Sequence, residues 1–162
     1  MGRFMNHKKW VVALALIATA LILTHLPVSE ADAAASASEF QIEGSTLTKY
    51  RGSDERVTIP DTVEVVGESA FENNQKVQFV VVPKSVKRMD AYVFWRCNYL
   101  EEVVLGKGLT SVDEYAFSGC TGLKQITIPE NVQSIDAQAF AGCTNLTDIY
   151  IPDTVTSIAD DA

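Results

Sequence analysis

Residues 126–146 read ITIPENVQSIDAQAFAGCTNL, and residues 103–123, which begin 23 positions earlier, read VVLGKGLTSVDEYAFSGCTGL. Both segments open with two aliphatic residues separated by one position, and both contain the motif Ala-Phe-small-Gly-Cys. A fixed period of roughly 20–29 residues predicts a solenoid, in which each repeat forms one coil of the stack. A single coil cannot bury its own apolar side chains, whereas stacked coils bury them against one another.

The same period extends in both directions along the chain, from residue 57 to residue 162. Phenylalanine recurs at 71, 94, 117 and 140, and a small or branched residue precedes each one. We therefore predict about 4.5 coils, of which the last is incomplete. Further columns hold aliphatic residues, cysteines and prolines, and Gly106 takes the proline place once: Ile59, Val82, Leu105, Ile128 and Ile151; Cys97, Cys120 and Cys143; Pro60, Pro83, Pro129 and Pro152.

Each coil is predicted to have two unlike halves. Residues 126–129 alternate apolar and polar side chains and end in proline, which indicates a short strand that pairs in parallel with its neighbours. The second half, around residues 136–140, is predicted to be a helical turn or irregular coil. Asp90, Asp113 and Asp136 precede this half in register, and they suit helix N-caps. The alternative is a column of carboxylates that binds a cation.

These columns resemble the BspA-like leucine-rich repeats. The pattern I-x-I-P-x-x-V-x-x-I-x-x-x-A-F-x-G-C-x-x-L is matched best by residues 126–146 and 103–123, and more loosely by the first two coils. Asn74 replaces the cysteine in the first coil, and Trp95-Arg96 replace the small-Gly pair in the second. The resemblance implies a leucine-rich-repeat solenoid and a secreted or surface protein of a microbe, of a kind often linked to adhesion to host or neighbouring cells.

The residues before the repeats are predicted to form three segments. Residues 1–33 combine basic residues, an apolar run and an A-x-A site at Ala31–Ala33, which is typical of a secretory signal peptide. The alternative is an uncleaved anchor, although the run is short for a membrane-spanning helix. Residues 34–38 are expected to be a loose tail. Residues 39–56 alternate around Glu43-Gly44-Ser45 and are expected to be N-terminal cap strands.

The C-terminal coil lacks its phenylalanine, its cysteine-column residue and a polar cap. Repeat stacks normally require such a cap. The sequence therefore indicates a fragment of a longer array, or self-association at the uncapped end.

Composition argues against catalysis and nucleic-acid binding. Both histidines, His7 and His25, lie in the predicted signal peptide, so Ser-His-Asp or Cys-His chemistry has no base in the remaining chain. No phosphate-binding glycine loop is present, and we predict no enzyme, no metal and no cofactor. The net charge of −8 repels phosphate backbones, which makes nucleic acid an unsuitable partner. A membrane is expected as a partner only through the signal peptide, before cleavage.

The three cysteines are an odd number for a protein that is predicted to be secreted. Their spacing stacks them on adjacent coils, where they are best interpreted as a ladder of buried small side chains. A bridge between two of them is the alternative, because the strand spacing of about 4.8 Å falls within disulfide range. A zinc site of three thiolates is the third alternative.

Binding residues in repeat proteins are expected where outward positions depart from the repeat. The second coil departs most, because aromatic and basic residues replace small ones there. Such residues are enriched in binding hot spots. A weaker candidate is the outer face of the predicted sheet. The first set comprises Trp95, Arg96, Tyr99, Tyr92, Lys84, Lys87 and Arg88; the second comprises Phe79, Val81, Val104 and Tyr150.

We therefore predict a secreted or cell-surface module that binds an extracellular protein or glycan of a host or neighbouring cell. The alternative is a structural spacer, or a fragment of a longer repeat array without its own ligand. The ring and guanidinium of Trp95 and Arg96 favour binding, and the missing C-terminal cap favours the spacer.

Overall fold

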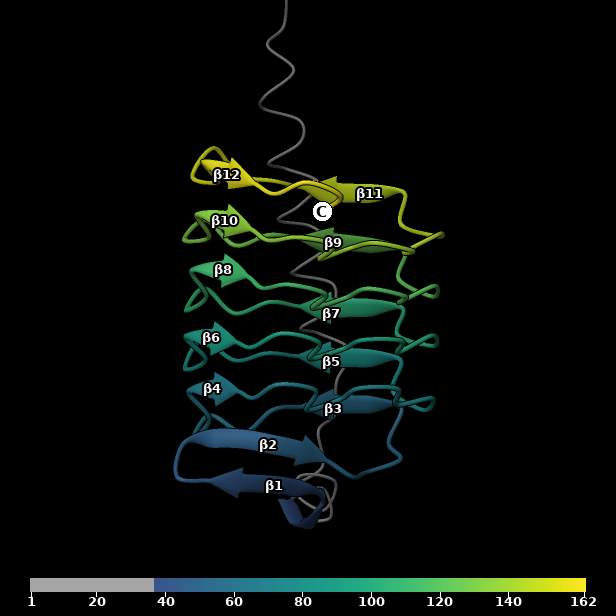
Figure 1. The fold of residues 1–162 in the computed structure, drawn as a ribbon. Coiled ribbons are helices and arrows are strands. Elements are labelled where there is room, and N and C mark those ends of the chain that lie inside the picture. Colours follow the sequence, from purple (N-terminus) through teal and green to yellow (C-terminus); the bar gives the residue numbers. More distant parts are fainter. Residues whose placement is uncertain (1–36) are drawn as a thin grey trace, which may run out of the picture. The chain divides into compact units, whose positions relative to one another are not determined.

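The computed structural model describes residues 37–162, so the predicted signal peptide and residues 34–36 of the predicted tail lie outside the described residues. The described chain is a solenoid of stacked coils (Figure 1), as the sequence predicts. No helix in this part is long and apolar enough to cross a membrane. The elements are η1 (Ala37–Glu39), β1 (Phe40–Glu43), β2 (Thr46–Tyr50), β3 (Arg56–Thr58), β4 (Val65–Val66), β5 (Phe79–Val81), β6 (Arg88–Met89), β7 (Glu102–Val104), β8 (Ser111–Val112), β9 (Gln125–Thr127), β10 (Ser134–Ile135), β11 (Asp148–Tyr150) and β12 (Ser157–Ile158).

One face of the solenoid is a parallel sheet with strand order β11-β9-β7-β5-β3. Each strand pairs with the equivalent residues of the next coil, so that Val80 lies between Val57 and Val103. The pairing continues from Val103 to Ile126 and from Ile126 to Ile149. The 23-residue period is therefore the register of the sheet.

A second face carries the two-residue strands, which form two short sheets. β4 and β6 pair in parallel, and β8, β10 and β12 form a separate sheet. The ladder is interrupted between Met89 of β6 and Val112 of β8. This interruption lies next to the loop in which Gly106 replaces the proline of the other coils.

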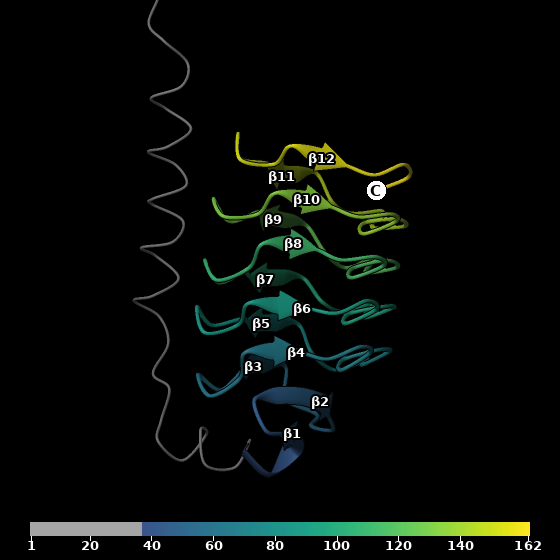
Figure 2. The same cartoon turned by 60° about the vertical axis from the view of Figure 1, so that its left-hand side comes forward.

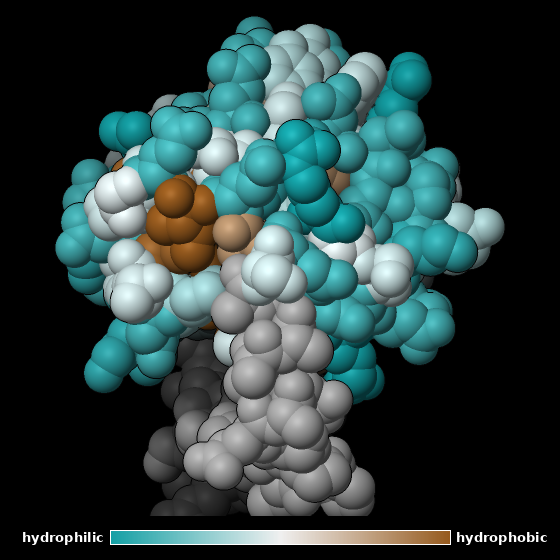
Figure 3. Space-filling model, turned by 90° about the horizontal axis from the view of Figure 1, so that it is seen from below, coloured by the Kyte–Doolittle hydropathy of each residue, from teal (hydrophilic) through white to brown (hydrophobic). Residues whose placement is uncertain are grey.

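The N-terminal end of the stack is an antiparallel hairpin. β1 pairs with β2 from Phe40↔Tyr50 to Glu43↔Thr46, and Gly44 makes the turn with φ 63°. β2 pairs in parallel with β4, which joins the hairpin to the first coil. Seen from this end, the described surface is mostly hydrophilic with one small hydrophobic patch (Figure 3). A polar outer surface is what keeps a terminal element of a repeat stack soluble.

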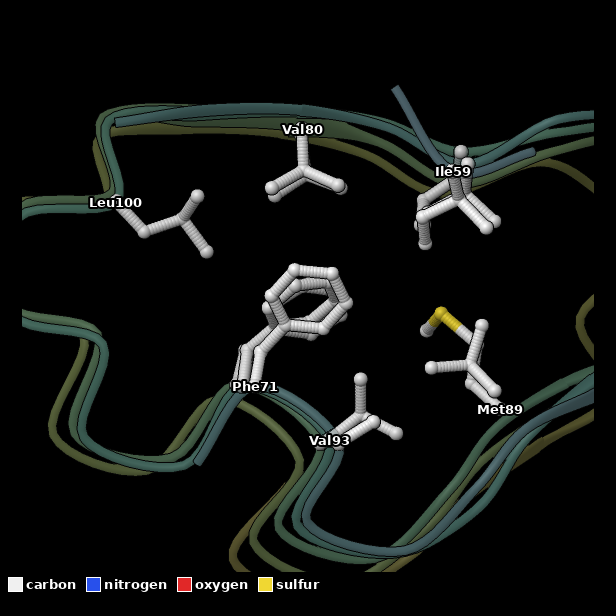
Figure 4. Close-up of a cluster of buried hydrophobic side chains, with 14 of the residues drawn as sticks. Ile59, Phe71, Val80, Met89, Val93 and Leu100 are labelled. Atoms are coloured by element: carbon white, nitrogen blue, oxygen red, sulfur yellow. The ribbon is translucent and has the colours of Figure 1, made fainter. Parts of the chain in front are cut away.

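The core consists of apolar ladders that run along the stack. Figure 4 shows Phe71 and its counterparts in the middle of each coil, with Val80, Met89 and Leu100 directed at them from three sides. Successive phenylalanine rings stack with centroids 5.0–5.4 Å apart, from Phe71 to Phe140. Tyr50 continues this ladder into the hairpin, 5.0 Å from Phe71.

The predicted helical turn is absent, and the irregular alternative holds. The 3-10 helix Ala37–Glu39 is the one helix among residues 37–162, so Asp90, Asp113 and Asp136 have no α-helix to cap. The carboxylates accept other bonds: Asp90 from Arg88, and Asp113 from the Ser111 hydroxyl at 2.6 Å.

Left-handed residues explain why this side cannot form a helix. In the second coil Tyr92 has φ 61° and Arg96 has φ 57°, and equivalent positions of the other coils have similar values. Right-handed helices exclude such values. N–H groups in this segment alternate between two kinds of partner. In the first coil the N–H of Phe71 donates to Val93 of the next coil, and the N–H of Glu72 donates to Ser69 within its own coil.

Candidate binding site

The turn between β6 and β7 and the equivalent turn of the next coil, between β8 and β9, together carry a surface cluster of three aromatic rings and one guanidinium. We call Tyr92, Trp95, Arg96 and Tyr115 the aromatic cluster. Tyr92 packs edge-on against Trp95 with ring centroids 5.9 Å apart, and it stacks face to face on Tyr115 at 4.8 Å. The Arg96 guanidinium lies over the Trp95 ring, 4.3 Å from its centroid. Each ring is half-buried and Arg96 is exposed, so the cluster is preorganised and accessible.

Arg96 occupies a backbone position that glycine occupies in the next two coils. Its φ of 57° lies in the left-handed region, as do the values of 74° at Gly119 and Gly142. A non-glycine residue in this region is destabilised by about 1–2 kcal/mol relative to its ordinary conformation. A Cβ on Gly119 would lie 3.2 Å from the Arg96 Cγ, so glycine there leaves room for the arginine stem. Gln75 donates a hydrogen bond to the Arg96 carbonyl at 2.7 Å.

Tyr92 has a pKa above its ordinary value. Desolvation against its neighbours is the main cause, and the Glu114 carboxylate adds to it. The hydroxyl is therefore protonated at neutral pH and can donate a hydrogen bond to a ligand.

Tyr115 was not among the candidates from the sequence. It occupies the same column as Tyr92, one coil later, and it has the same left-handed backbone with φ 55°. Candidates were sought where the second coil departs from its neighbours, and a tyrosine repeated in two coils is no departure. Its 23-residue spacing from Tyr92 is the signal that could have identified it.

The other predicted residues lie apart from the aromatic cluster. Tyr99 follows Cys97 on the same turn and is 59% exposed. Lys84 and Lys87 lie on the loop between β5 and β6. Figures 1 and 2 both place that loop at the opposite edge of the coil from the turn that carries Trp95. Arg88, in β6, pairs with Asp90 at 2.6 Å. The structure thus separates Lys84 and Lys87 from the aromatic cluster, whereas Arg96 lies within it.

The outer face of the longer sheet offers little continuous apolar surface. Phe79 is buried beneath the Arg56 guanidinium, which lies 4.6 Å from the centroid of its ring. Val81 and Val104 are half-buried. Tyr150 is 44% exposed, and its hydroxyl donates to Glu130 at 3.3 Å.

The cysteines form a ladder of free thiols inside the solenoid. Each thiol donates to the carbonyl of the phenylalanine 26 residues earlier, with Sγ to O distances of 3.0–3.1 Å. Burial raises the pKa of Cys97 to about 12 and that of Cys143 to about 11, so neither is a thiolate at neutral pH. Across residues 37–162, no group of three or more histidine, cysteine or acidic side chains is arranged to hold a metal ion.

Residues 45–162 match the family model for the BspA type leucine rich repeat region, in six copies. The match covers the described coils and begins within the hairpin. No curated protein sequence matches the chain.

Three solved structures are similar to the described solenoid. A leucine-rich cell surface protein from Faecalibacterium prausnitzii has 29% identity and a TM-score of 0.67, over 72% of this chain and 35% of that one. A leucine-rich repeat protein from T. pallidum has 27% identity and a TM-score of 0.74, over 77% and 64% respectively. The pneumococcal vaccine antigen PcpA, at 21% identity and a TM-score of 0.68 over 75% and 32%, shares the fold. The chain thus spans about a third of the first protein and less than two thirds of the second.

Proposed function

Because the chain belongs to the BspA-type leucine-rich repeat family, we propose that it is a secreted or cell-surface recognition module that binds a protein or glycan of a host or neighbouring cell. The aromatic cluster is the proposed contact surface. The proposal rests on one observation: Arg96 has a left-handed backbone where the next two coils have glycine, and its guanidinium lies over the Trp95 ring.

Left-handed non-glycine residues occur in every coil, so this backbone is part of the repeat, and it is the side chain of Arg96 that distinguishes the second coil. Tryptophan, tyrosine and arginine are also the residues that contribute most to binding hot spots. The stacking in the aromatic cluster fixes the rings before a ligand arrives, which lowers the entropic cost of binding. These arguments support recognition rather than chemistry, and leucine-rich repeat folds are typically non-catalytic.

The similar structures support the proposed location, which is the cell surface. One of them is described as a cell surface protein and another as a vaccine antigen of pneumococcus. A module of this family at a microbial surface would meet host or neighbouring cells, where an exposed aromatic cluster can make contact.

A binding panel tests the proposal. The purified protein is compared with its Trp95→Ala/Arg96→Gly variant for binding to extracellular-matrix proteins, host cells and bacterial envelope glycans. Tyr150→Ala is the matched control, because it removes an exposed aromatic side chain from the sheet face. Loss of binding in the double variant alone, with unchanged unfolding, supports the aromatic cluster. Equal binding by all three proteins refutes it, and loss in the control alone moves the site to the sheet.

The second candidate is a structural spacer. Its support is the length of the similar proteins, since this chain covers only 35% and 32% of two of them. If the chain is a spacer, the wild-type protein should bind none of the partners in the panel.

A further inference from the structure

The loops at the edge opposite the aromatic cluster border a second surface feature, an open hollow of about 500 Å³. Figures 1 and 2 show the loops β3–β4, β5–β6 and β7–β8 stacked along this edge. We call this feature the basic hollow. Its lining comes from three successive coils: Asp61, Lys84, Ser85, Lys87, Lys107 and Gly108.

Glycine makes the floor of the basic hollow possible. A Cβ on Gly106 would lie 2.3 Å from the Pro83 carbonyl oxygen, and a Cβ on Gly108 would lie 2.3 Å from that of Val86. Real Cβ atoms do not approach backbone oxygens so closely, so the third loop reaches the second only because glycine stands at both positions.

Positive charge is confined to this part of the edge. The loop column reads Asp61, Lys84, Lys107, Glu130 and Asp153 from the first coil to the fifth. Lys87 adds a third ammonium, in a chain whose net charge is −8. None of the three lysines takes part in an ion pair among the described residues. Unpaired cations from adjacent coils, on an otherwise acidic protein, define a local anion-attracting field.

Ser85 gives the basic hollow an unused hydrogen-bond donor. Its Oγ is buried and has no hydrogen-bond partner. Buried hydroxyls without a protein partner are rare and destabilising, and they are normally satisfied by a water or an ion. An anionic oxygen held by the neighbouring lysines can accept this bond.

A second hollow, of about 320 Å³, continues the same edge in the fourth and fifth coils. It is lined by amides, hydroxyls and one carboxylate, from Glu130, Asn131, Gln133, Thr154 and Thr156. The second hollow lies two coils further along the stack than the basic hollow, which corresponds to about 10 Å at the usual strand spacing. Amide and hydroxyl groups pair with sugar hydroxyls, whereas a bound peptide is normally anchored by apolar pockets. Neither hollow is lined by a large apolar side chain.

We propose that the basic hollow binds the sulfate or carboxylate group of an acidic polysaccharide, whose neighbouring sugars lie along the second hollow. Lys84, Lys87 and Lys107 neutralise the anion and Ser85 donates a hydrogen bond to it. The site is separate from the aromatic cluster, so it stands or falls independently of the proposed function.

The experiment measures binding of the purified protein to four polymers at low and physiological ionic strength. Heparin carries sulfates and carboxylates, hyaluronan carries carboxylates only, dextran is neutral, and poly-glutamate is an acidic peptide. We expect heparin, hyaluronan or both to bind, with weaker binding at higher salt, and dextran and poly-glutamate to fail. Hyaluronan binding identifies the carboxylate as sufficient, and heparin binding alone identifies the sulfate.

Variants localise the site. Lys84→Glu/Lys107→Glu should weaken binding by about tenfold or more. Lys76→Glu/Lys124→Glu, which changes the net charge equally but lies outside the hollow, should have a small effect. Ser85→Ala should weaken binding severalfold while the protein stays folded. Trp95→Ala/Arg96→Gly should bind heparin as the wild type does, which separates this site from the aromatic cluster.

Three results would overturn the proposal. The first is that neither acidic polysaccharide binds. The second is an equal loss in the two charge-reversal variants, which would indicate unspecific attraction. The third is equal or tighter binding of poly-glutamate, which would assign the basic hollow to an acidic peptide.

Discussion

The Cys120 thiol donates a hydrogen bond to the carbonyl oxygen of Phe94 in the preceding coil, with 3.0 Å between Sγ and O. Cys97 and Cys143 make the same bond one coil before and one coil after. The cysteine column therefore links consecutive coils through hydrogen bonds rather than through sulfur–sulfur bonds. Protonated thiols are needed for this arrangement, since a thiolate cannot donate.

Alkaline conditions should therefore destabilise the fold. Burial raises the pKa of Cys97 to about 12 and that of Cys143 to about 11, whereas a thiol in the unfolded chain titrates near ~8.5. Above that lower value the unfolded state loses protons that the folded state keeps, so the free energy of unfolding falls with pH until the folded pKa is reached. Urea denaturation from pH 7 to pH 11 measures this decline. A Cys97→Ala/Cys143→Ala variant should show a shallower decline, and an identical slope would contradict the assignment.

Thiol labelling should follow burial. Cys97 and Cys120 are fully buried, whereas Cys143 is half-buried in the fourth coil and has the lowest of the three raised pKa values. We expect iodoacetamide to modify Cys143 first in the native protein at pH 8, because reactivity follows thiolate population and access. Mass spectrometry of digested time points gives the order. Simultaneous labelling of all three would show that the native ladder opens as one unit.

Two phenylalanines of one column should differ in their contribution to stability. Phe117 is fully buried between two neighbouring rings, whereas Phe140 is half-buried in the fourth coil. Phe117→Ala should lower the free energy of unfolding by about 3–5 kcal/mol. Phe140→Ala, the matched change, should cost roughly half as much because less apolar area is lost. Chemical denaturation of both variants measures the difference, and equal losses would mean that the coils unfold without regard to local burial.

A carboxylate column should destabilise the protein at neutral pH. The pKa of Asp113 is raised, chiefly by desolvation and also by Asp136 and Asp90, while the Ser111 hydroxyl partly offsets this. A raised folded pKa means that stability grows as pH falls through it, because the folded state takes up the proton first. Asp113→Asn should therefore raise the melting temperature at pH 7 and flatten its rise between pH 7 and pH 4. The exposed Asp160→Asn is the control, and a lower melting temperature in Asp113→Asn at pH 7 would contradict this account.

The stack could be predicted from sequence because its register is the repeat itself. Any slip between Val80 and Val103 would misalign every apolar ladder at once. The turn side could not be predicted, because its left-handed positions hold serine, asparagine, tyrosine, arginine, glutamine and aspartate as well as glycine. No single residue type marks that conformation. For this reason, one of the two interpretations of this half of the coil was a helical turn capped by aspartate.

The candidate site was predicted in part, for a geometric reason. Trp95 and Arg96 stand out because they break the repeat, and the structure does bring them together. Lys84 and Lys87 belong to the same coil, but closeness in sequence does not give closeness in space when the chain turns between two strands. The two groups consequently lie at opposite edges, and each defines a surface of its own.

Substitution of Gly106, in the loop between β7 and β8, by a residue with a side chain should destabilise the protein. Gly106→Ala places a Cβ against the Pro83 carbonyl, so we expect a loss of about 1–3 kcal/mol in the free energy of unfolding. Pro129 occupies the same column in the fourth coil and already carries a Cβ. Pro129→Ala should therefore cost less, about 1 kcal/mol or under. Urea denaturation compares the two, and a neutral Gly106→Ala would show that the loops are not in close contact.

Arg96 allows stability and recognition to be separated by one thermodynamic cycle. In the wild type, Arg96→Gly relieves a left-handed backbone, which is worth about 1–2 kcal/mol, and it removes a cation–π contact, which is worth about 0.5–1 kcal/mol. The two effects oppose each other, so only a small net change in the free energy of unfolding is expected. In the Trp95→Ala background the contact is already gone, and Arg96→Gly should stabilise the protein by about 1–2 kcal/mol.

Urea denaturation of the wild type, both single variants and the double variant measures this coupling. An Arg96→Gly effect that is equal in both backgrounds would show that the guanidinium gains nothing from the ring over which it lies. The proposed function adds a second readout, because Arg96→Gly should weaken ligand binding without lowering the free energy of unfolding. Loss of binding together with undiminished stability would support a role of the Arg96 side chain in ligand contact, and unchanged binding would contradict it.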